Sequence, residues 1–313
     1  MMNIKEKNFV SAVVYVHNAE RQIGRFLEMI IQTMEDNFEH SEVICVNDSS
    51  EDRSLEEIKK IGATAKTASI SVINMSGFHG LELAVNAGVD MAIGDYIFEF
   101  DNVCQDFAAS VIMDIYHHSL TGYDIVSASP DRRERLTSRI FYSVFDWFSE
   151  RASRMCTESF RVLSRRAVNR IGSTNKTVLY RKAVYANCGL KTDHIKYQTD
   201  VILKNYIDKK EKRYRLGLAV DSLILFTELG YRFSVTLTVF MMMMSIFMVI
   251  YSVIIYTTAH PVAGWTTTIL FLSVAFFGVF GVMTVVIKYL QLLVDLMFKR
   301  KHYSYESVEK LSG

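Results

Sequence analysis

Apolar runs alternate with polar turns over the first hundred residues of the chain. Short runs rich in β-branched and aromatic residues predict strands at 9–16, 43–46, 69–75 and 95–100. Between these runs, apolar residues at helical spacing predict helices that begin near residues 23, 55 and 81. Because strands and helices alternate, the pattern predicts a Rossmann-like α/β fold with a mostly parallel sheet flanked by helices.

Polar residues follow three of the predicted strands. Asn18 and Glu20 come after the first strand, Asp48 after the second and Asp101 after the fourth. Ligands of open α/β sheets bind outside the carboxyl ends of the strands. We therefore expect these side chains to converge on one cleft.

A long uncharged stretch follows the α/β region. No Asp, Glu, Lys or Arg occurs from Phe233 to Ile287. His260-Pro261 divides the stretch into two apolar runs of about 25 residues, each long enough to cross a hydrocarbon core of ~30 Å. The sequence predicts two transmembrane helices at 235–258 and 265–287; a pair of buried core helices is the alternative.

Basic residues indicate the orientation of this hairpin. Lys288, Lys299, Arg300 and Lys301 follow the second run, whereas the loop at 257–264 contains no basic residue except His260. By the positive-inside rule, both termini and the α/β domain face the cytoplasm. Residues 1–9 contain no apolar signal sequence. The predicted location is therefore the inner (cytoplasmic) membrane, with a multi-pass anchor.

Charge and cysteine content exclude some classes of function. The formal net charge is +1, so the chain lacks the global basic excess that is typical of nucleic-acid-binding proteins. The four cysteines, at 45, 104, 156 and 188, form no CxxC pair. This spacing favours a reduced compartment over a disulfide framework or a zinc site.

Five sequence blocks follow one another in a specific order. They are VYVHNAE (Val14–Glu20), VNDSSED (Val46–Asp52), the glycine-containing block Gly77–Tyr96, GYDIV with Ser127-Ala128-Ser129 (Gly122–Ser129), and SFRVLSRRA (Ser159–Ala167). Together they resemble the inverting GT-A glycosyltransferases of family 2, a group that includes dolichyl-phosphate mannose synthases and bacterial polyprenyl-phosphate glycosyltransferases. The glycine-containing block is the most specific, because Ala84, Asn86, Gly88, Ala92 and Gly94-Asp95-Tyr96 all match.

The resemblance implies a site for a nucleotide-sugar donor. The residues implied to bind it are Asn18, Glu20, Asp48, Ser50, Gly77, His79, Asn86 and Arg132. A carboxylate such as that of Asp48 can accept the imide N–H of uracil. Alternatively, Asp48 and Ser50 cap the following helix, and His79 has a structural role.

Arg161 lies in the block that the family places near the phosphate of donor or acceptor. A guanidinium is a permanent, forked donor to phosphate oxygens, so Arg161 is predicted to be catalytic together with Asp101. The alternative for Arg161 is an ordinary surface charge.

The segment FEFDNVCQD occupies the place of the family's D-A-D-x-Q metal motif. Asp101 and Gln105 match and are the implied ligands of Mg²⁺ or Mn²⁺, whereas Val103 replaces the second aspartate and offers no ligand atom. Three interpretations follow, in order of preference. Asp101 and Gln105 hold the metal with Asp106, arginine or lysine side chains replace the metal, or catalysis is lost.

These observations predict four regions: a GT-A-like domain at 1–170, an acceptor-side region at 171–232, a transmembrane hairpin at 233–290 and a cytoplasmic tail at 291–313. The resemblance implies that one sugar passes from a nucleoside diphosphate donor, UDP-linked, to polyprenyl phosphate at the cytoplasmic leaflet.

A phosphate acceptor is already anionic and needs no strong general base. A hydroxyl of a lipid-linked glycan is the alternative acceptor, with Asp101, Asp106 or Asp200 as the base. An inactive homologue that binds nucleotide-sugar is a hypothesis of another class. A homo-oligomer formed through the hairpin is a further possible assembly, although Gly278 and Gly281 lack GxxxG spacing.

Overall fold

The computed structural model describes residues 5–131, 158–174, 180–199, 264–298 and 303–312, with isolated residues between 213 and 247. The chain divides into two compact units. Unit 1 consists of Met1–Trp147, Arg151–Ala219 and Arg300–Gly313, and unit 2 consists of Phe148–Glu150 and Val220–Lys299.

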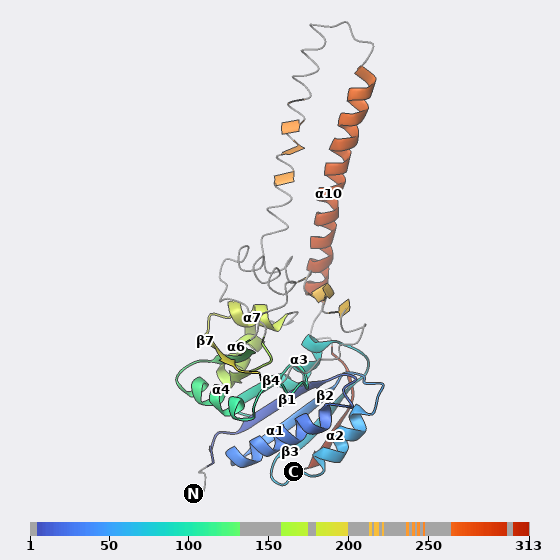
Figure 1. Cartoon of the computed structure of the whole chain (residues 1–313). Helices are drawn as coiled ribbons and strands as arrows, with labels where there is room; N and C mark the ends of the chain where they lie inside the picture. The colour runs from blue at the N-terminus through green and yellow to red at the C-terminus, as the bar shows by residue number, and fades with distance from the viewer. Residues whose placement is uncertain are drawn as a thin grey trace. The chain divides into compact units, whose positions relative to one another are not determined.

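The described residues of unit 1 form one mixed eight-stranded sheet in the order β7-β5-β6-β4-β1-β2-β3-β8 (Figure 1). The strands are β1 (Val10–Val16), β2 (Ser41–Asn47), β3 (Ser69–Met75), β4 (Tyr96–Phe100), β5 (Ile125–Pro130), β6 (Phe160–Ser164), β7 (Thr192–Tyr197) and β8 (Tyr305–Ser312). Strands β1 to β4 are parallel, as predicted. β6 runs antiparallel to β4 and β5, and β8 runs antiparallel to β3, so the complete sheet is mixed.

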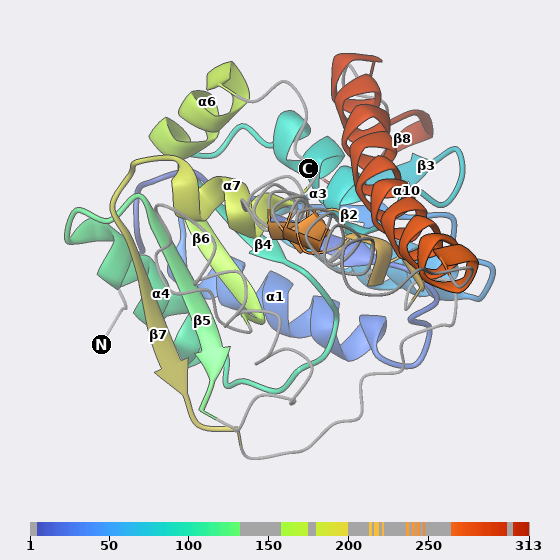
Figure 2. The same cartoon turned by 90° about the horizontal axis from the view of Figure 1, so that it is seen from above.

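Helices cover both faces of this sheet, and Figure 2 shows α1 and α3 on opposite sides of the central strands. The helices with defined bounds in the described part of unit 1 are α1 (Ile23–Asn37), α2 (Ser54–Gly62), α3 (Leu81–Met91), α4 (Ser110–Leu120), α6 (Arg165–Thr174) and α7 (Arg181–Asn187). The three helices predicted near residues 23, 55 and 81 are confirmed.

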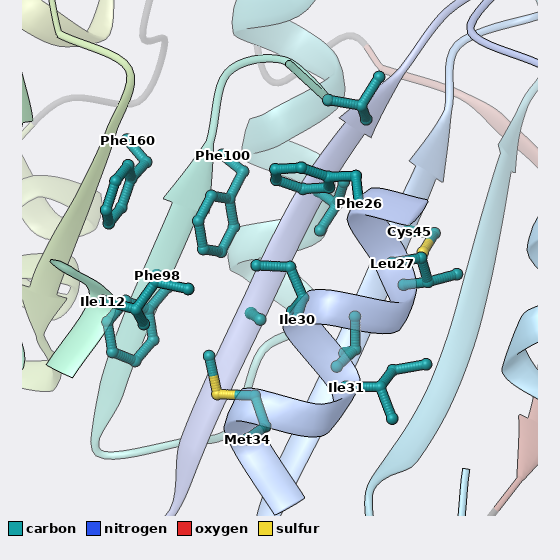
Figure 3. Packing of buried hydrophobic residues seen from close by; sticks show 14 of the residues in the cluster. Phe26, Leu27, Ile30, Ile31, Met34, Cys45, Phe98, Phe100, Ile112 and Phe160 are labelled. Atoms are coloured by element: carbon teal, nitrogen blue, oxygen red, sulfur yellow. The ribbon is translucent and has the colours of Figure 1, made fainter. Parts of the chain in front are cut away.

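The central strand β1 is buried on both faces. Its even-numbered residues, such as Val14, join the cluster formed by α1, α2 and α4, while Val13 and Tyr15 join the cluster formed by α3. Figure 3 shows the first cluster, in which Phe26 of α1 packs against Phe100 of β4, and Phe100 in turn stacks on Phe160 of β6. On the other face, α3 approaches so closely that a Cβ on Gly88 would lie 2.4 Å from Cγ1 of Val13.

The region predicted as a tail contains a strand that the sequence analysis did not anticipate. Residues 305–312 form β8 at the edge of the sheet, beside β3. Asn74 of β3 donates to Ser307 Oγ at 3.0 Å and to Glu309 Oε1 at 3.1 Å. Leu311 packs so tightly on Gly62 that a Cβ there would lie 2.7 Å from Leu311 Cδ1. β8 is therefore an integral part of unit 1.

Unit 2 contains α10 (Gly264–Phe298), which covers the second predicted membrane span. The described residues between 236 and 247 are also helical. Gly278 lies against the side chain of Met241 and Gly281 against that of Leu237. As the residue number rises on α10 it falls on its neighbour, so the two segments run antiparallel.

Within the described part of the chain, no helix combines the length and the apolar character that crossing a bilayer requires. The predicted spans at 235–258 and 265–287 are therefore not confirmed, and most of the first lies outside the described residues. The transmembrane hairpin stays a prediction.

Candidate functional site

A buried group of charged side chains lies at the carboxyl end of β4. We call it the arginine cluster and define it as Glu82, Glu99, Asp101, Arg161 and Arg181. Both guanidinium groups are about 1% exposed. They are held together by charge-assisted hydrogen bonds, which are stronger than bonds between neutral groups.

Each arginine bridges two carboxylates of the β4 segment. Arg161 donates from Nη1 to Glu99 Oε2 at 3.0 Å and from Nη2 to Asp101 Oδ2 at 2.6 Å. Arg181 donates from Nη1 to Glu99 Oε2 at 2.9 Å and from Nη2 to Asp101 Oδ1 at 2.7 Å. Its Nε donates to Glu82 Oε2 at 2.8 Å.

The sheet register explains why these residues meet. Glu99 of β4 and Arg161 of β6 are direct cross-strand partners, so their side chains share one face of the sheet. Side chains alternate along a strand, which places Glu99 on the face opposite Phe98 and Phe100. That is the face covered by α3, which supplies Glu82.

The cluster keeps Asp101 ionised. Burial alone would raise the pKa of Asp101, but the charges of Arg161 and Arg181 outweigh it and hold that pKa well below its usual range. Tyr185 of α7 donates to Glu99 Oε1 at 2.7 Å. Burial and the Glu99 charge raise the pKa of Tyr185, so its phenol stays protonated and continues to donate.

A second buried carboxylate, Asp48, joins the ends of three strands. It follows β2, and its side chain is fully buried. Oδ1 accepts the backbone N–H of His79 at 2.8 Å, while Oδ2 accepts the N–H of Gly80 at 2.8 Å and the hydroxyl of Tyr15 at 3.2 Å. Asp48 thus fixes the segment after β3, Ser76–Gly80, which we call the glycine loop.

Aromatic side chains cover the glycine loop. Gly80 has φ +82°, a conformation that favours glycine, and a Cβ there would lie 2.3 Å from the ring of Tyr214. Phe78 packs with its ring centroid 4.8 Å from His17 and 5.9 Å from Tyr214. The Nδ1 atom of His79 lies 2.6 Å from the carbonyl oxygen of Gly77.

The loops after β1 and β2 are bound to each other. Asn18 Oδ1 accepts the N–H of Glu51 at 2.8 Å, and the N–H of Asn18 donates to Ser50 Oγ at 3.1 Å. Glu20 Oε2 accepts the N–H of Arg53 at 3.3 Å. The structure therefore brings Asn18, Glu20 and Asp48 to one edge of the sheet, as predicted from the strand ends, and Ser50, Gly77 and His79, which the resemblance implied, lie beside them.

The other predicted residues are placed differently. Asn86 lies half-buried on α3, one helical turn after Glu82. Gln105 is exposed, and its Nε2 donates to the sulfur of Met29 at 3.2 Å. Arg132 and Asp200 lie outside the described residues.

The described residues do not fit a divalent cation at the D-A-D-x-Q position. Each carboxylate oxygen of Asp101 is already paired with a guanidinium, and Val103 is buried in the core. Asp106 is buried and accepts the hydroxyl of Tyr197 at 2.9 Å. The described part of the chain contains no group of three His, Cys, Asp or Glu residues arranged to hold a metal ion. Mg²⁺ or Mn²⁺ therefore stays a prediction.

Sequence reasoning missed three members of the arginine cluster: Glu82, Glu99 and Arg181. A signal existed for Glu99, because a charged residue in the middle of the apolar run YIFEF needs a partner when the strand is buried. Arg181 stands in no matched block, and only the fold of α7 onto β4 identifies it.

Comparisons with known proteins cover most of this site. A sequence profile described as Glycosyl transferase family 2 matches residues 11–172, the part that extends from β1 into α6. An uncharacterized glycosyltransferase from Synechocystis sp. is 26% identical over 197 residues, which are 61% of this chain and 61% of the relative. A prophage bactoprenol glucosyl transferase homolog from Escherichia coli (strain K12) is 30% identical over 195 residues, 60% of this chain and 62% of the relative.

The chain thus matches about three fifths of the length of these two relatives. Among solved structures, the mannosyltransferase PcManGT from Pyrobaculum calidifontis, in complex with GDP-Man and Mn²⁺, superposes with a TM-score of 0.48. It shares 14% identity, and the superposition covers 72% of this chain and 64% of that chain.

Proposed function

The chain belongs to glycosyl transferase family 2, and from this premise we propose that it transfers one sugar from a nucleoside diphosphate-sugar, UDP-linked, to polyprenyl phosphate. The observation that supports a nucleotide-sugar donor is the hydrogen-bond network around Asp48. This network holds the loops after β1, β2 and β3 together at one edge of the sheet. In open α/β sheets this edge is where nucleotides bind.

Two observations support a lipid-linked acceptor. The Escherichia coli relative is named a bactoprenol glucosyl transferase homolog. In addition, unit 2 exposes many large apolar side chains: Phe240, Met243, Phe247, Leu272, Phe276, Phe277, Val279, Met283, Val286, Ile287, Leu290 and Leu293. Soluble surfaces rarely carry so many, and contiguous apolar surfaces of this kind mark contacts with membranes or proteins. We propose that lipid covers them.

The order of elements along the chain supports an anchor that enters and leaves the membrane at the same face. Residues before unit 2 form β1 to β7, and residues after it form β8 of the same sheet. Any membrane passage within Val220–Lys299 must therefore cross the bilayer an even number of times. With the positive-inside rule, this supports a catalytic unit at the cytoplasmic face of the inner membrane.

The proposed reaction needs few catalytic groups. The acceptor phosphate oxygen attacks the anomeric carbon in line, the configuration inverts, and the nucleoside diphosphate leaves. Arg161 has a buried Nε–H with no hydrogen-bond partner among the described residues. A buried donor without a partner is unfavourable, and a phosphate oxygen is a suitable acceptor for it. No step is assigned to a metal ion.

A transfer assay with matched variants tests this proposal. The detergent-purified protein is incubated with a panel of nucleotide-sugars and undecaprenyl phosphate, and sugar in the lipid phase is measured. Asp101→Asn is compared with Asp124→Asn, because both aspartates are buried and paired with arginine, but Asp124 contacts Arg166 away from the arginine cluster. We expect Asp101→Asn to abolish transfer and Asp124→Asn to retain it.

The same assay separates the alternatives. If sugar were transferred only to a lipid-linked glycan, the acceptor group would be a sugar hydroxyl and not polyprenyl phosphate. Transfer that persists in EDTA is expected, because both oxygens of Asp101 are paired with guanidinium groups. Loss in EDTA with recovery in Mn²⁺ would mean that an arginine releases Asp101 when the donor binds.

One observation favours a second candidate, a homologue that binds nucleotide-sugar without transferring it. Val103 is a core residue and both carboxylate oxygens of Asp101 are paired with guanidinium groups, so neither position of the metal motif presents an oxygen atom to a cation in this structure. Donor binding measured by calorimetry, without transfer to any acceptor, would select this candidate. Any catalytic turnover by the purified protein eliminates it.

The membrane orientation has its own test. Single cysteines are introduced at Lys310, an exposed residue of β8, and within residues 257–264, which separate the two predicted spans, and are labelled in intact cells with an impermeant maleimide. We expect the loop to react from outside and position 310 to react only after lysis. Labelling of position 310 in intact cells would contradict the proposed orientation.

A further inference from the structure

The segment that enters β8 touches the glycine loop. The carbonyl oxygen of Ser304 accepts the backbone N–H of Ser76 at 3.0 Å and its hydroxyl at 3.1 Å, and the two hydroxyl oxygens lie 2.5 Å apart. The backbone N–H of Ser304 donates to His79 Nε2 at 3.3 Å. One residue therefore contacts both ends of the loop.

The loop is thus held from two directions. From β2, Asp48 accepts the backbone N–H groups of His79 and Gly80. From β8, Ser304 contacts Ser76 and the ring of His79. The hydrogen bonds of Asp48 are buried, whereas Ser304 and Ser76 are exposed. The Ser304 contacts therefore depend on the position of the residues at the start of β8.

Hydrogen bonds to the rest of unit 1 fix the residues at the start of β8. Asn47 donates to Asn74, and Asn74 donates to Ser307 and Glu309, so a chain of hydrogen bonds extends from β2 through β3 to β8. Just before Ser304, the hydroxyl of Tyr303 donates to Asp90 of α3. The start of β8 is therefore fixed to both the sheet and the helix that follows the glycine loop.

We propose that β8 is a positioning element of the donor site, with Ser304 as the positioning residue that sets the glycine loop for a nucleoside diphosphate. The inference rests on the proposed function, because it assigns the loop to the donor. The profile match ends at residue 172, so β8 lies outside the part of the chain that the family profile covers. Ser304 contacts the loop at Ser76 and His79 and needs no contact with the donor.

Serine-to-alanine variants at the two ends of one strand test this role. Ser304→Ala removes the Ser304 hydroxyl that faces Ser76, and Ser76→Ala removes the Ser76 hydroxyl that faces Ser304. The matched control is Ser312→Ala, whose hydroxyl donates to the carbonyl oxygen of Ala68 at 3.2 Å at the far end of β8. The measurements are KM for donor, KM for acceptor, kcat, and hydrogen exchange of the amides in 76–80.

We expect Ser304→Ala and Ser76→Ala each to raise the donor KM by about threefold to tenfold, the range of one lost hydrogen bond. The kcat and the acceptor KM should stay unchanged, and amide exchange in the loop should become faster. The double variant should raise the donor KM by less than the product of the two single effects, because both substitutions remove the contact between the two hydroxyls. Ser312→Ala should change none of these values.

Two results overturn the proposal. An unchanged donor KM and unchanged loop exchange in Ser304→Ala would show that the contact positions nothing. Equal changes in Ser304→Ala and Ser312→Ala would show that β8 only stabilises the sheet. Failure of the proposed function is distinct: the wild-type protein would then transfer no sugar, while loop exchange would still report whether Ser304 restrains the loop.

Discussion

Replacing Arg181 with methionine isolates the contribution of the arginine cluster to stability. The side chain is about 1% exposed and bonds to Glu82, Glu99 and Asp101. Without it, Glu82 loses the guanidinium that pairs with it, while Glu99 and Asp101 keep their pairs with Arg161. Removing one partner of a buried ion pair destabilises a protein by about 3–5 kcal/mol, and we expect a loss of this size for Arg181→Met.

Thermal unfolding followed by circular dichroism measures the effect. For a domain of this size, about 2–4 °C corresponds to 1 kcal/mol, so the midpoint should fall by roughly 6–20 °C. The matched control is Arg166→Met, since Arg166 pairs with Asp124 but its side chain is 70% exposed. Exposed pairs contribute about 0–1 kcal/mol, so the control should shift the midpoint by no more than about 4 °C.

The double variant Arg181→Met with Glu99→Gln refines the test. Removing the Glu99 charge relieves repulsion among the carboxylates that remain, so the double variant should lose less stability than the sum of the two single variants. Equal midpoints for Arg181→Met and Arg166→Met would refute the reasoning, because the buried network would then contribute no more than a surface pair.

Three further predictions follow from single positions. Because the folded state lowers the pKa of Asp101, its contribution to stability is present above about pH 4, its unfolded value, and is lost as the pH falls further; the unfolding midpoint should drop on acidification, and a midpoint that rises would contradict the assignment. Burial raises the pKa of the Cys45 thiol to about 12, so iodoacetamide at pH 8 should modify Cys45 only in denaturant, as mass spectrometry can show. Gly88→Ala places a Cβ within 2.4 Å of Val13 and 2.8 Å of Val46; overpacking should destabilise unit 1 by about 1–3 kcal/mol in urea titrations, and an unchanged midpoint would mean that α3 shifts freely.

The local pattern of hydrophobic residues predicted the strands and helices whose neighbours in the fold are also close in the sequence. The runs that became β1, β2 and β3 were located to within two residues at each end, because buried parallel strands are rich in Val and Ile. Their polar ends then predicted that Asn18, Glu20 and Asp48 lie together. Ser50 joins them in the structure.

Contacts between segments far apart in the chain could not be predicted from the local sequence pattern. β8 has the polar pattern YESVEKLS, typical of an exposed edge strand or of a tail, and its partner β3 lies more than two hundred residues earlier. Arg181 lies in a short helix with no periodic signal, and its role depends on the docking of α7 near Glu99. Val103 was recognised as a lost ligand, but its place in the core became evident only from the packing.

The position of β8 also orders events during synthesis. Strands β1 to β7 leave the ribosome first, and β3 then has an unpaired edge, which is prone to pair with other chains. Its partner emerges only after all of Val220–Lys299 has been made. The sheet is therefore completed only after unit 2 has been made, so a nascent chain stalled within unit 2 presents an unpaired strand edge at residues 69–75, which is open to pairing with other chains.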